Sequence, residues 1–442
     1  MKGRRLTPRP GNTGPRASRT VVLLGAFCLF LSTLEYLIPK PLPLVRIGLA
    51  NLPLMLALDL LSPRYFGLLA LIKIAGAGII GGTIFSYVFV FSLFGSLASA
   101  LVMYGLRVSA GPRISLAGIG VAGAMCSSGA QLFLARFLVF GEGIRYLVPP
   151  FLAMSLITGC ALGLFCEHFC RRSRWYRQAS DAGGNPAPVP VSTPPRRPKN
   201  RREQRREARR SRWDRCFNGP ELIIAGFIAL LLFLFNGSTL GRTLQFLFFW
   251  LCAWLSGRNN RPLITFSIIA GVVLVNLLVP YGRVLAELGP LHITTGSLID
   301  GLRKGITLEG LVMLSSAVIR GKPSPGAPAL SGSGPGAAGI FRLAVFRRAA
   351  VFGRFLGESL SVFAVLSENR GRIRPAHFID DVDTLLLEMD GPSAPVNRAP
   401  AEGQASGRLP ANGRRRLIFG LLITAALVAA PLLLSWWFGV AI

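Results

Sequence analysis

Long apolar runs, separated by short turn-forming stretches, make up most of the first 170 residues. A helix that crosses a membrane needs about 20 predominantly apolar residues. The breaks between the runs contain Pro and Gly, which end helices. No small-x-small cleavage site follows the first run, so we expect that run to remain as a helix. The pattern predicts membrane helices at 20–38, 44–61, 64–82, 84–106, 114–138 and 146–169.

The second half of the chain repeats this pattern less regularly. Apolar runs lie at 221–236, 240–256, 262–281 and 417–440, and a weaker run with four charged residues lies at 293–319. An amphipathic stretch at 341–390 precedes the last run, and we expect it to stay cytoplasmic. The fold class is therefore expected to be all-α: a polytopic membrane protein with about 11 transmembrane helices, six in the first half and five in the second.

The charge distribution predicts the orientation of these helices. The chain is 51% hydrophobic and 16% charged, yet its net charge is +29. The basic residues gather in the tail 1–19 and in the Pro-rich segment 171–219, between apolar runs and not on one folded face. Short segments rich in Lys and Arg stay on the cytoplasmic side of a membrane. We expect a cytoplasmic tail, a disordered cytoplasmic linker at 171–219, membrane domains at 20–170 and 220–442, and no nucleic-acid partner.

Polar side chains within the first two apolar runs are the first candidates for a binding site. Glu35, Arg46 and Asn51 interrupt otherwise apolar sequence. A charged residue in a membrane span costs roughly 2.5–3.5 kcal/mol on insertion scales, so it usually faces protein or a water-filled cavity. We expect these three residues to bind a ligand near the outer surface. The alternatives are interfacial snorkelling or a Glu35–Arg46 pair, and an interhelical hydrogen bond for Asn51.

Further polar residues lie deeper in the expected helices. Lys73 is either a counter-ion for an anionic ligand or a partner of Asp59, whose own role we expect to be structural, next to Arg64. Three polar residues of the fifth run are expected to face the same cavity: Ser127, Ser128 and Gln131. Two pairs of glycines at i and i+4 indicate close helix packing: Gly78 with Gly82, and Gly159 with Gly163.

A family resemblance rests on the motif LEYLIPKPLPLVRIGLAN at 34–51 and on GVAGAMCSSGAQL at 120–132. Residues 20–170 resemble the Gx transporter family, also described as heptaprenyl diphosphate synthase component I. Arg46 stands where that family usually has Lys, and Ser127-Ser128 where it commonly has His-Asn. The resemblance implies a six-helix module in a bacterial cytoplasmic membrane, similar to the substrate-binding S components of energy-coupling-factor transporters.

The second half weakly resembles the T component of such transporters. ITLEGLVMLSSAVI at 306–319 is similar to the start of a T-component helix, and the amphipathic stretch takes the place of the coupling helices. Asn369-Arg370-Gly371 comes near the Ala-Arg-Gly motif of those helices, so Arg370 and Gly371 are expected to contact partner ATPases. The resemblance implies a transport protein that binds a small molecule, with the lipid bilayer and separate ATPase subunits as partners.

Motifs for catalysis by this chain itself are lacking. The sequence contains no G-x-x-x-x-G-K-[ST] loop for ATP phosphates, and FIDDVDTLLLEMD at 378–390 fails the Asp-Asp-x-x-Asp spacing of prenyl synthases, because residue 384 is Thr. A metal site at Cys166-Glu-His-Phe-Cys170 would need a fourth ligand. We expect no enzyme activity, metal or cofactor. The alternative function is a non-catalytic membrane subunit in heptaprenyl diphosphate or quinone metabolism.

The orientation is tested by labelling single cysteines from outside in a cysteine-free variant. Cysteines placed in 1–19, 171–215 or 340–413 are expected to stay unlabelled in intact cells, because the basic segments hold these regions in the cytoplasm. A cysteine after Ile442 is expected to react. Labelling of the 171–215 segment in intact cells contradicts this orientation.

Overall fold

Helices dominate the protein in the computed structural model, which describes residues 15–37, 48–180, 204–206, 208–209, 221–236, 239–257, 262–288, 291–319, 344–368 and 377–390. The described part of the first half comprises the helices α1 (Pro15–Leu37), α2 (Leu52–Ala57), α3 (Pro63–Gly81), α4 (Tyr87–Ala110), α5 (Leu116–Ala135), α6 (Ile144–Arg172) and α7 (Arg174–Ser180). The described part of the second half comprises α9 (Glu221–Phe235), α10 (Thr239–Leu255), α11 (Pro262–Leu277), α12 (Thr295–Val318), α13 (Ala344–Glu368) and α14 (Phe378–Asp390).

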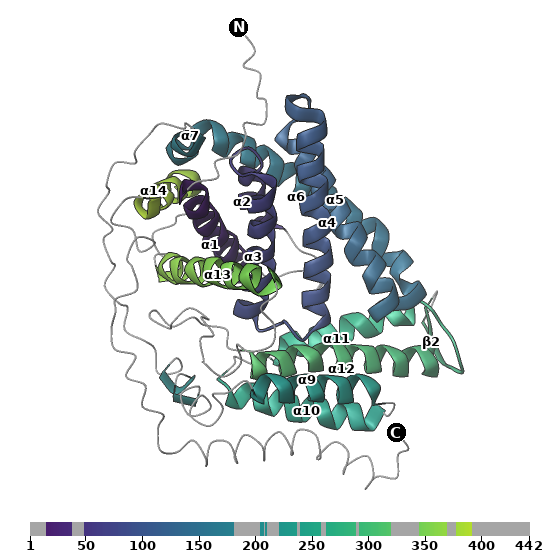
Figure 1. Ribbon diagram of the computed structural model, residues 1–442. Helices are drawn as coiled ribbons and strands as arrows, with labels where there is room; N and C mark the ends of the chain where they lie inside the picture. The colour runs from purple at the N-terminus through teal and green to yellow at the C-terminus, as the bar shows by residue number, and fades with distance from the viewer. Residues whose placement is uncertain are drawn as a thin grey trace, which may run out of the picture.

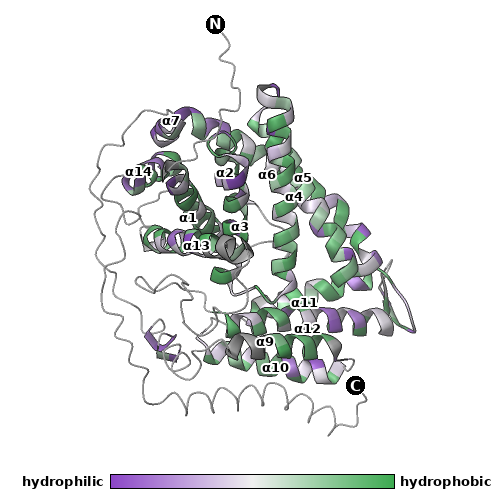
Figure 2. Ribbon diagram, in the orientation of Figure 1, coloured by the Kyte–Doolittle hydropathy of each residue, from purple (hydrophilic) through white to green (hydrophobic). Residues whose placement is uncertain are grey.

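Four described segments are long and apolar enough to cross a membrane: 17–35, 63–81, 87–110 and 116–172, the last of which contains α5 and α6. Large apolar side chains lie exposed on the outer faces of α4, α5 and α6, including Leu101, Phe133, Phe137 and Ile157. Figure 2 shows these helices as largely hydrophobic ribbons. Exposed faces that carry several large apolar side chains are typical of surfaces that contact lipid. The prediction of an all-α membrane protein is confirmed.

The prediction of one continuous helix at 44–61 is wrong. A 3-10 turn at Leu49–Asn51 leads into α2, which has only six residues, all of them buried. Pro53 stands at the start of α2, and the chain turns again before Pro63 begins α3. Hydropathy cannot distinguish an apolar run buried in protein from one in lipid. Non-helical backbone is tolerated at membrane depth when protein surrounds it.

Helix α1 lies inside the protein. Every side chain from 21 to 31 is buried, and α1 packs against α3 on one side and α13 on another. Figure 1 shows α13 crossing α1 and α3. A Cβ added at Gly25 would lie 2.7 Å from the Ser359 hydroxyl, so the small residue permits the close approach of α13. The first and second halves therefore share one apolar core.

Helices α9–α12 form a second group around α12. This helix is buried from Gly305 to Ser315 and contacts α9, α10 and α11. Arg242 donates hydrogen bonds to the Thr307 hydroxyl at 3.0 Å and to the Leu234 carbonyl at 3.0 Å, which ties α10 to α12 and α9. Figure 1 shows the group lying across the ends of α3 and α4, where the backbone N–H of Phe85 donates to the Ser315 hydroxyl at 3.0 Å.

The second half also differs from the expected pattern of five spans. Helices α9, α10 and α11 have 15, 17 and 16 residues, which is short for a membrane span of about 20 residues. An antiparallel hairpin of β1 (Val284–Leu288) and β2 (Leu291–Thr294) precedes α12 and was not predicted. The last expected span, 417–440, lies outside the described residues. The number eleven stays a prediction.

Small residues permit the closest helix contact, between α5 and α6. A Cβ added at Gly163 would lie 2.4 Å from the Cα of Ala117, and one at Gly159 would lie 2.9 Å from the Gly120 carbonyl oxygen. The close-packing interpretation of this pair is confirmed. Gly82 serves differently, because it ends α3 in the left-handed conformation at φ 60°, which glycine adopts without steric cost.

Gly163→Leu is therefore expected to destabilise the protein by about 1–3 kcal/mol, since overpacking forces helices apart. Thermal unfolding in detergent provides the measurement. Gly129→Leu is the matched control on α5, because a Cβ there meets nothing within 4 Å. Equal melting temperatures for the two variants contradict the close α5–α6 contact.

Candidate functional site

The motif Gly48-Leu49-Ala50-Asn51 forms a turn beside the end of α1. Gly48 has φ 81°, a conformation that favours glycine. Its backbone N–H donates to the Glu35 carboxylate at 3.2 Å, and its carbonyl accepts the backbone N–H of Asn51 at 2.8 Å. The Glu35 side chain is only 6% exposed. The turn thus brings Glu35 and Asn51, two of the predicted site residues, to one place.

Lys73 joins this turn to the middle of the helix bundle. It lies near the middle of α3 and is 7% exposed. Its ammonium group donates hydrogen bonds to the side-chain oxygen of Asn51 and, at 3.2 Å, to the hydroxyl of Ser96 on α4. A buried ammonium requires such partners, because desolvating an isolated charge is very costly. Asn51, Lys73 and Ser96 form what we call the Lys73 cluster.

Two of the three predicted polar residues of α5 face α4, the helix that carries Ser96. The Gln131 amide donates to the Ser127 hydroxyl at 3.0 Å. Both side chains face Gly95 of α4, where an added Cβ would lie 2.6 Å from the Gln131 nitrogen and 2.9 Å from the Ser127 oxygen. Gly95 directly precedes Ser96 in the sequence. The Lys73 cluster and the Ser127–Gln131 pair therefore contact consecutive residues of α4, Ser96 and Gly95.

Ser128 points elsewhere, contrary to the prediction that it shares a cavity with Ser127. Its hydroxyl forms a hydrogen bond with the hydroxyl of Ser155 on α6, and both residues are buried. Consecutive residues in an α-helix are separated by about 100° around the helix axis, since one turn takes 3.6 residues. Ser127 and Ser128 cannot both face α4. Ser128 instead stabilises the contact of α5 with α6.

Asp59 forms an ion pair with Arg107 of α4, which donates from Nε and Nη2 to the two carboxylate oxygens at 2.7 Å each. The structural role expected for Asp59 is confirmed, but the partner is Arg107 and not the neighbouring Arg64. The alternative of Lys73 as the partner of Asp59 is not supported, because Arg107 takes both oxygens of Asp59 and Lys73 donates to Asn51 and Ser96. Arg46, Arg370 and Gly371 lie outside the described residues.

Two residues of α4 escaped the sequence analysis. Ser96 accepts a hydrogen bond from Lys73. Ser99, three residues further on, is 1% exposed, and among the described residues its hydroxyl has no hydrogen-bond partner. Residues at i and i+3 share a helix face, so Gly95, Ser96 and Ser99 mark the side of α4 that avoids lipid. The spacing of these small residues could have predicted a buried face of α4. The backbone turn at Gly48, which directs Asn51 toward Lys73, could not be predicted from the sequence.

The arrangement offers hydrogen-bond donors and one cation inside an apolar bundle. The ammonium of Lys73, the hydroxyls of Ser96 and Ser99, and the amides of Asn51 and Gln131 suit an anionic or carbonyl-bearing ligand. Within the described ranges, no group of three or more His, Cys, Asp and Glu residues is placed to hold a metal ion. These donors form a buried or half-buried polar group within the apolar bundle.

Comparison with known families agrees with the resemblance drawn from the sequence. Residues 24–169 match the family model of heptaprenyl diphosphate synthase component I. Residues 222–321, which contain α9–α12, match a domain family of unknown function. No curated protein and no solved structure matches the chain. The membrane domain that carries the Lys73 cluster thus has the expected similarity to the heptaprenyl diphosphate synthase component I family, over residues 24–169.

Proposed function

We propose that the protein is the substrate-binding and coupling part of an energy-coupling-factor-type transporter for a small anionic molecule in a bacterial cytoplasmic membrane. The observation that carries this proposal is the buried ammonium of Lys73, held between Asn51 and Ser96 in a membrane domain. An ionisable residue at such depth is a functional-site candidate by default. Glu35, Asn51, Lys73, Ser127 and Gln131 are the residues proposed to surround the ligand, with Arg46 at its outer end.

The ligand class follows from the charge of the cluster. Lys73 supplies a cation, while Asn51, Ser96, Ser99 and Gln131 supply neutral donors and acceptors. A carboxylate or phosphate would accept hydrogen bonds from these groups, and charge-assisted bonds are about twice as strong as neutral ones. Ser99 in particular has a buried hydroxyl without a partner in the described structure, which a ligand would satisfy.

Coupling is proposed to run through α1 and α13. The amphipathic stretch that contains α13 contacts α1 and α3, and α3 carries Lys73. A ligand that alters the position of α3 would therefore act directly on the packing of α13. In this proposal the chain itself is no enzyme, and ATP hydrolysis belongs to separate ATPase subunits that contact Arg370 and Gly371.

A second candidate is a non-catalytic membrane subunit linked to heptaprenyl diphosphate synthesis. The description of the matched family favours this candidate, and the match covers one third of the chain. The two candidates differ in their partners, because a transporter recruits ATPases and a synthase subunit recruits a prenyl synthase. They agree on an anionic ligand, since a diphosphate would suit Lys73.

The ligand site is tested with Asn51→Leu and Lys73→Met. Both variants are expected to lose retention of the bound metabolite by roughly 10- to 100-fold, because a hydrogen bond to a charged group is worth about 1.5–3 kcal/mol. Mass spectrometry of small molecules extracted from the purified protein gives the measurement and identifies the ligand.

Ser127→Ala and Ser128→Ala form the matched pair for this experiment. They remove a hydroxyl from adjacent positions, but Ser127 faces α4 at Gly95, whereas Ser128 bonds Ser155 of α6. Ser127→Ala is expected to weaken retention and Ser128→Ala to leave it unchanged while lowering stability. Normal retention in Asn51→Leu and Lys73→Met, at wild-type expression, excludes the cluster as the ligand site.

Coupling is tested by copurification under mild extraction. The wild-type chain is expected to bring down an ATPase pair, and Arg370→Ala to reduce that yield at unchanged expression, because Arg370 would insert into the ATPase surface. Arg372→Ala is a control for the loss of positive charge in the same segment. Recovery of a prenyl synthase subunit instead of an ATPase favours the second candidate.

A further inference from the structure

The helix α14 is an acidic island in a basic chain. Five of the 20 acidic residues of the protein lie within its 13 residues, and the helix contains no Lys or Arg. It docks on the junction between α6 and α7 and on the start of α1. The contact lies at the end of the first membrane domain that the basic tail and linker assign to the cytoplasm.

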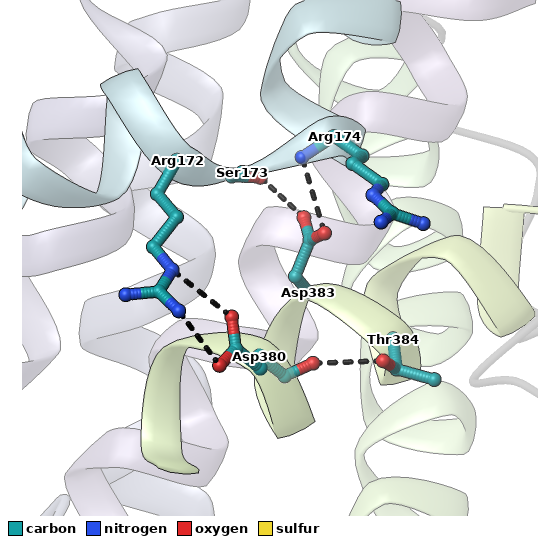
Figure 3. Close-up of polar contacts among 6 residues, drawn as sticks. All are labelled: Arg172, Ser173, Arg174, Asp380, Asp383 and Thr384. Atoms are coloured by element: carbon teal, nitrogen blue, oxygen red, sulfur yellow. Dashed lines mark hydrogen bonds and ion pairs between the residues drawn. The ribbon is translucent and has the colours of Figure 1, made fainter.

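Asp383 is the centre of this contact, as Figure 3 shows. Its carboxylate accepts the hydroxyl of Ser173 and the backbone N–H groups of Arg174 and Trp175, the latter two at 3.1 and 3.0 Å. Asp383 is only 8% exposed. The carboxylate therefore replaces water at the start of α7, where unpaired N–H groups and the helix dipole favour a negative charge.

Ion pairs hold both ends of α14. Near its start, Arg172 contacts the Asp380 carboxylate with Nε at 3.3 Å and Nη2 at 3.4 Å (Figure 3). At its end, Arg19 Nε lies 3.0 Å from the Asp390 carboxylate. Between these points Val382, Leu386 and Met389 are buried in the core that contains α1. The contact combines an apolar face with charges that are matched in sign.

The surface under α14 has the composition of an anionic-lipid site. Four arginines lie exposed at the end of α6 and in α7: Arg171, Arg172, Arg174 and Arg177. Helix α6 has 29 residues, so at 1.5 Å per residue it is longer than the roughly 30 Å apolar core of a bilayer. Its arginine end must therefore lie among the lipid headgroups, where each Lys or Arg is attracted by anionic lipids.

We propose that α14 is an electrostatic latch that competes with anionic phospholipid headgroups for the arginines of the α6–α7 junction. In a neutral bilayer, Asp380 pairs with Arg172, Asp383 accepts the backbone N–H groups of Arg174 and Trp175, and the helix stays docked. In an anionic bilayer, headgroups bind the arginines and repel the aspartates of α14, so the helix is released. This surface is separate from the Lys73 cluster, and the proposal does not depend on the ligand.

Hydrogen exchange of the full-length protein in lipid nanodiscs tests the latch. An isolated helix of 13 residues is marginal in water, so release should expose the amides of 378–390 together with those of Arg174 and Trp175. In nanodiscs of phosphatidylcholine alone, the amides of 378–390 and those of Arg174 and Trp175 are expected to exchange slowly. With about a third of phosphatidylglycerol, their exchange is expected to rise roughly 10-fold or more, and 1 M NaCl should reduce that difference.

Asp383→Asn is expected to release α14 even in phosphatidylcholine, by roughly 10- to 100-fold in exchange rate, because a charged acceptor of three hydrogen bonds is lost. Glu358→Gln is the matched control, since it removes an exposed carboxylate of α13 that pairs with Arg354 outside the latch. Its exchange over 378–390 should equal that of the wild type.

Three outcomes overturn the proposal. Equal protection of 378–390 in both lipid mixtures makes α14 a permanent structural helix, and the wild-type comparison decides this even if Asp383→Asn does not fold. Equal release by inorganic phosphate in phosphatidylcholine nanodiscs, beyond that of NaCl at the same ionic strength, assigns the surface to a soluble anion. Release of α14 without faster exchange at Arg174 and Trp175 shows that Asp383 does not hold the junction.

Discussion

The cost of unsatisfied polar groups in an apolar medium governs this structure. Neither lipid nor a packed core supplies hydrogen-bond partners, so each buried polar group must find one within the chain. The break in the apolar run at 44–61 follows from this constraint. Gly48 adopts a left-handed conformation, and its N–H donates to the Glu35 carboxylate. The side-chain oxygen of Asn51 accepts a hydrogen bond from Lys73. The irregular backbone at Gly48 and the polar cluster at Lys73 thus satisfy each other's buried hydrogen-bonding groups.

The same constraint explains how the two halves of the chain are joined. At one end of the first domain, the N–H of Phe85 finds the Ser315 hydroxyl of α12. At the other end, the open N–H groups of α7 find Asp383 of α14. A third contact between the two halves is the apolar packing of α13 on α1. Hydrogen bonds set the positions of these contacts, and apolar burial supplies most of their stability.

Hydropathy predicted α3, α4, α5 and α6 to within a few residues, because lipid-exposed helices must be continuous and apolar. It failed at α2, where protein replaces lipid, and at the β1–β2 hairpin, which lies outside the apolar runs. The expense of intramembrane charge singled out Lys73 and Asn51, which form a hydrogen bond in the structure, while their role in binding a ligand stays a prediction. It could not assign Ser128 to α6, because only the rotation of α5 decides between adjacent residues.

The enclosure of α1 has a consequence for biogenesis. Helix α1 leaves the ribosome long before α13, yet Gly25 packs against Ser359, more than three hundred residues later in the chain. Until α13 is synthesised, one flank of α1 has only lipid or the insertion machinery as its neighbour. The first domain is therefore completed by the last third of the chain, and such long-range closure is slow. The linker expected to begin at 171 is in fact ordered through α7, and a nascent chain that stalls after α7 would present an unfinished membrane domain to quality-control proteases.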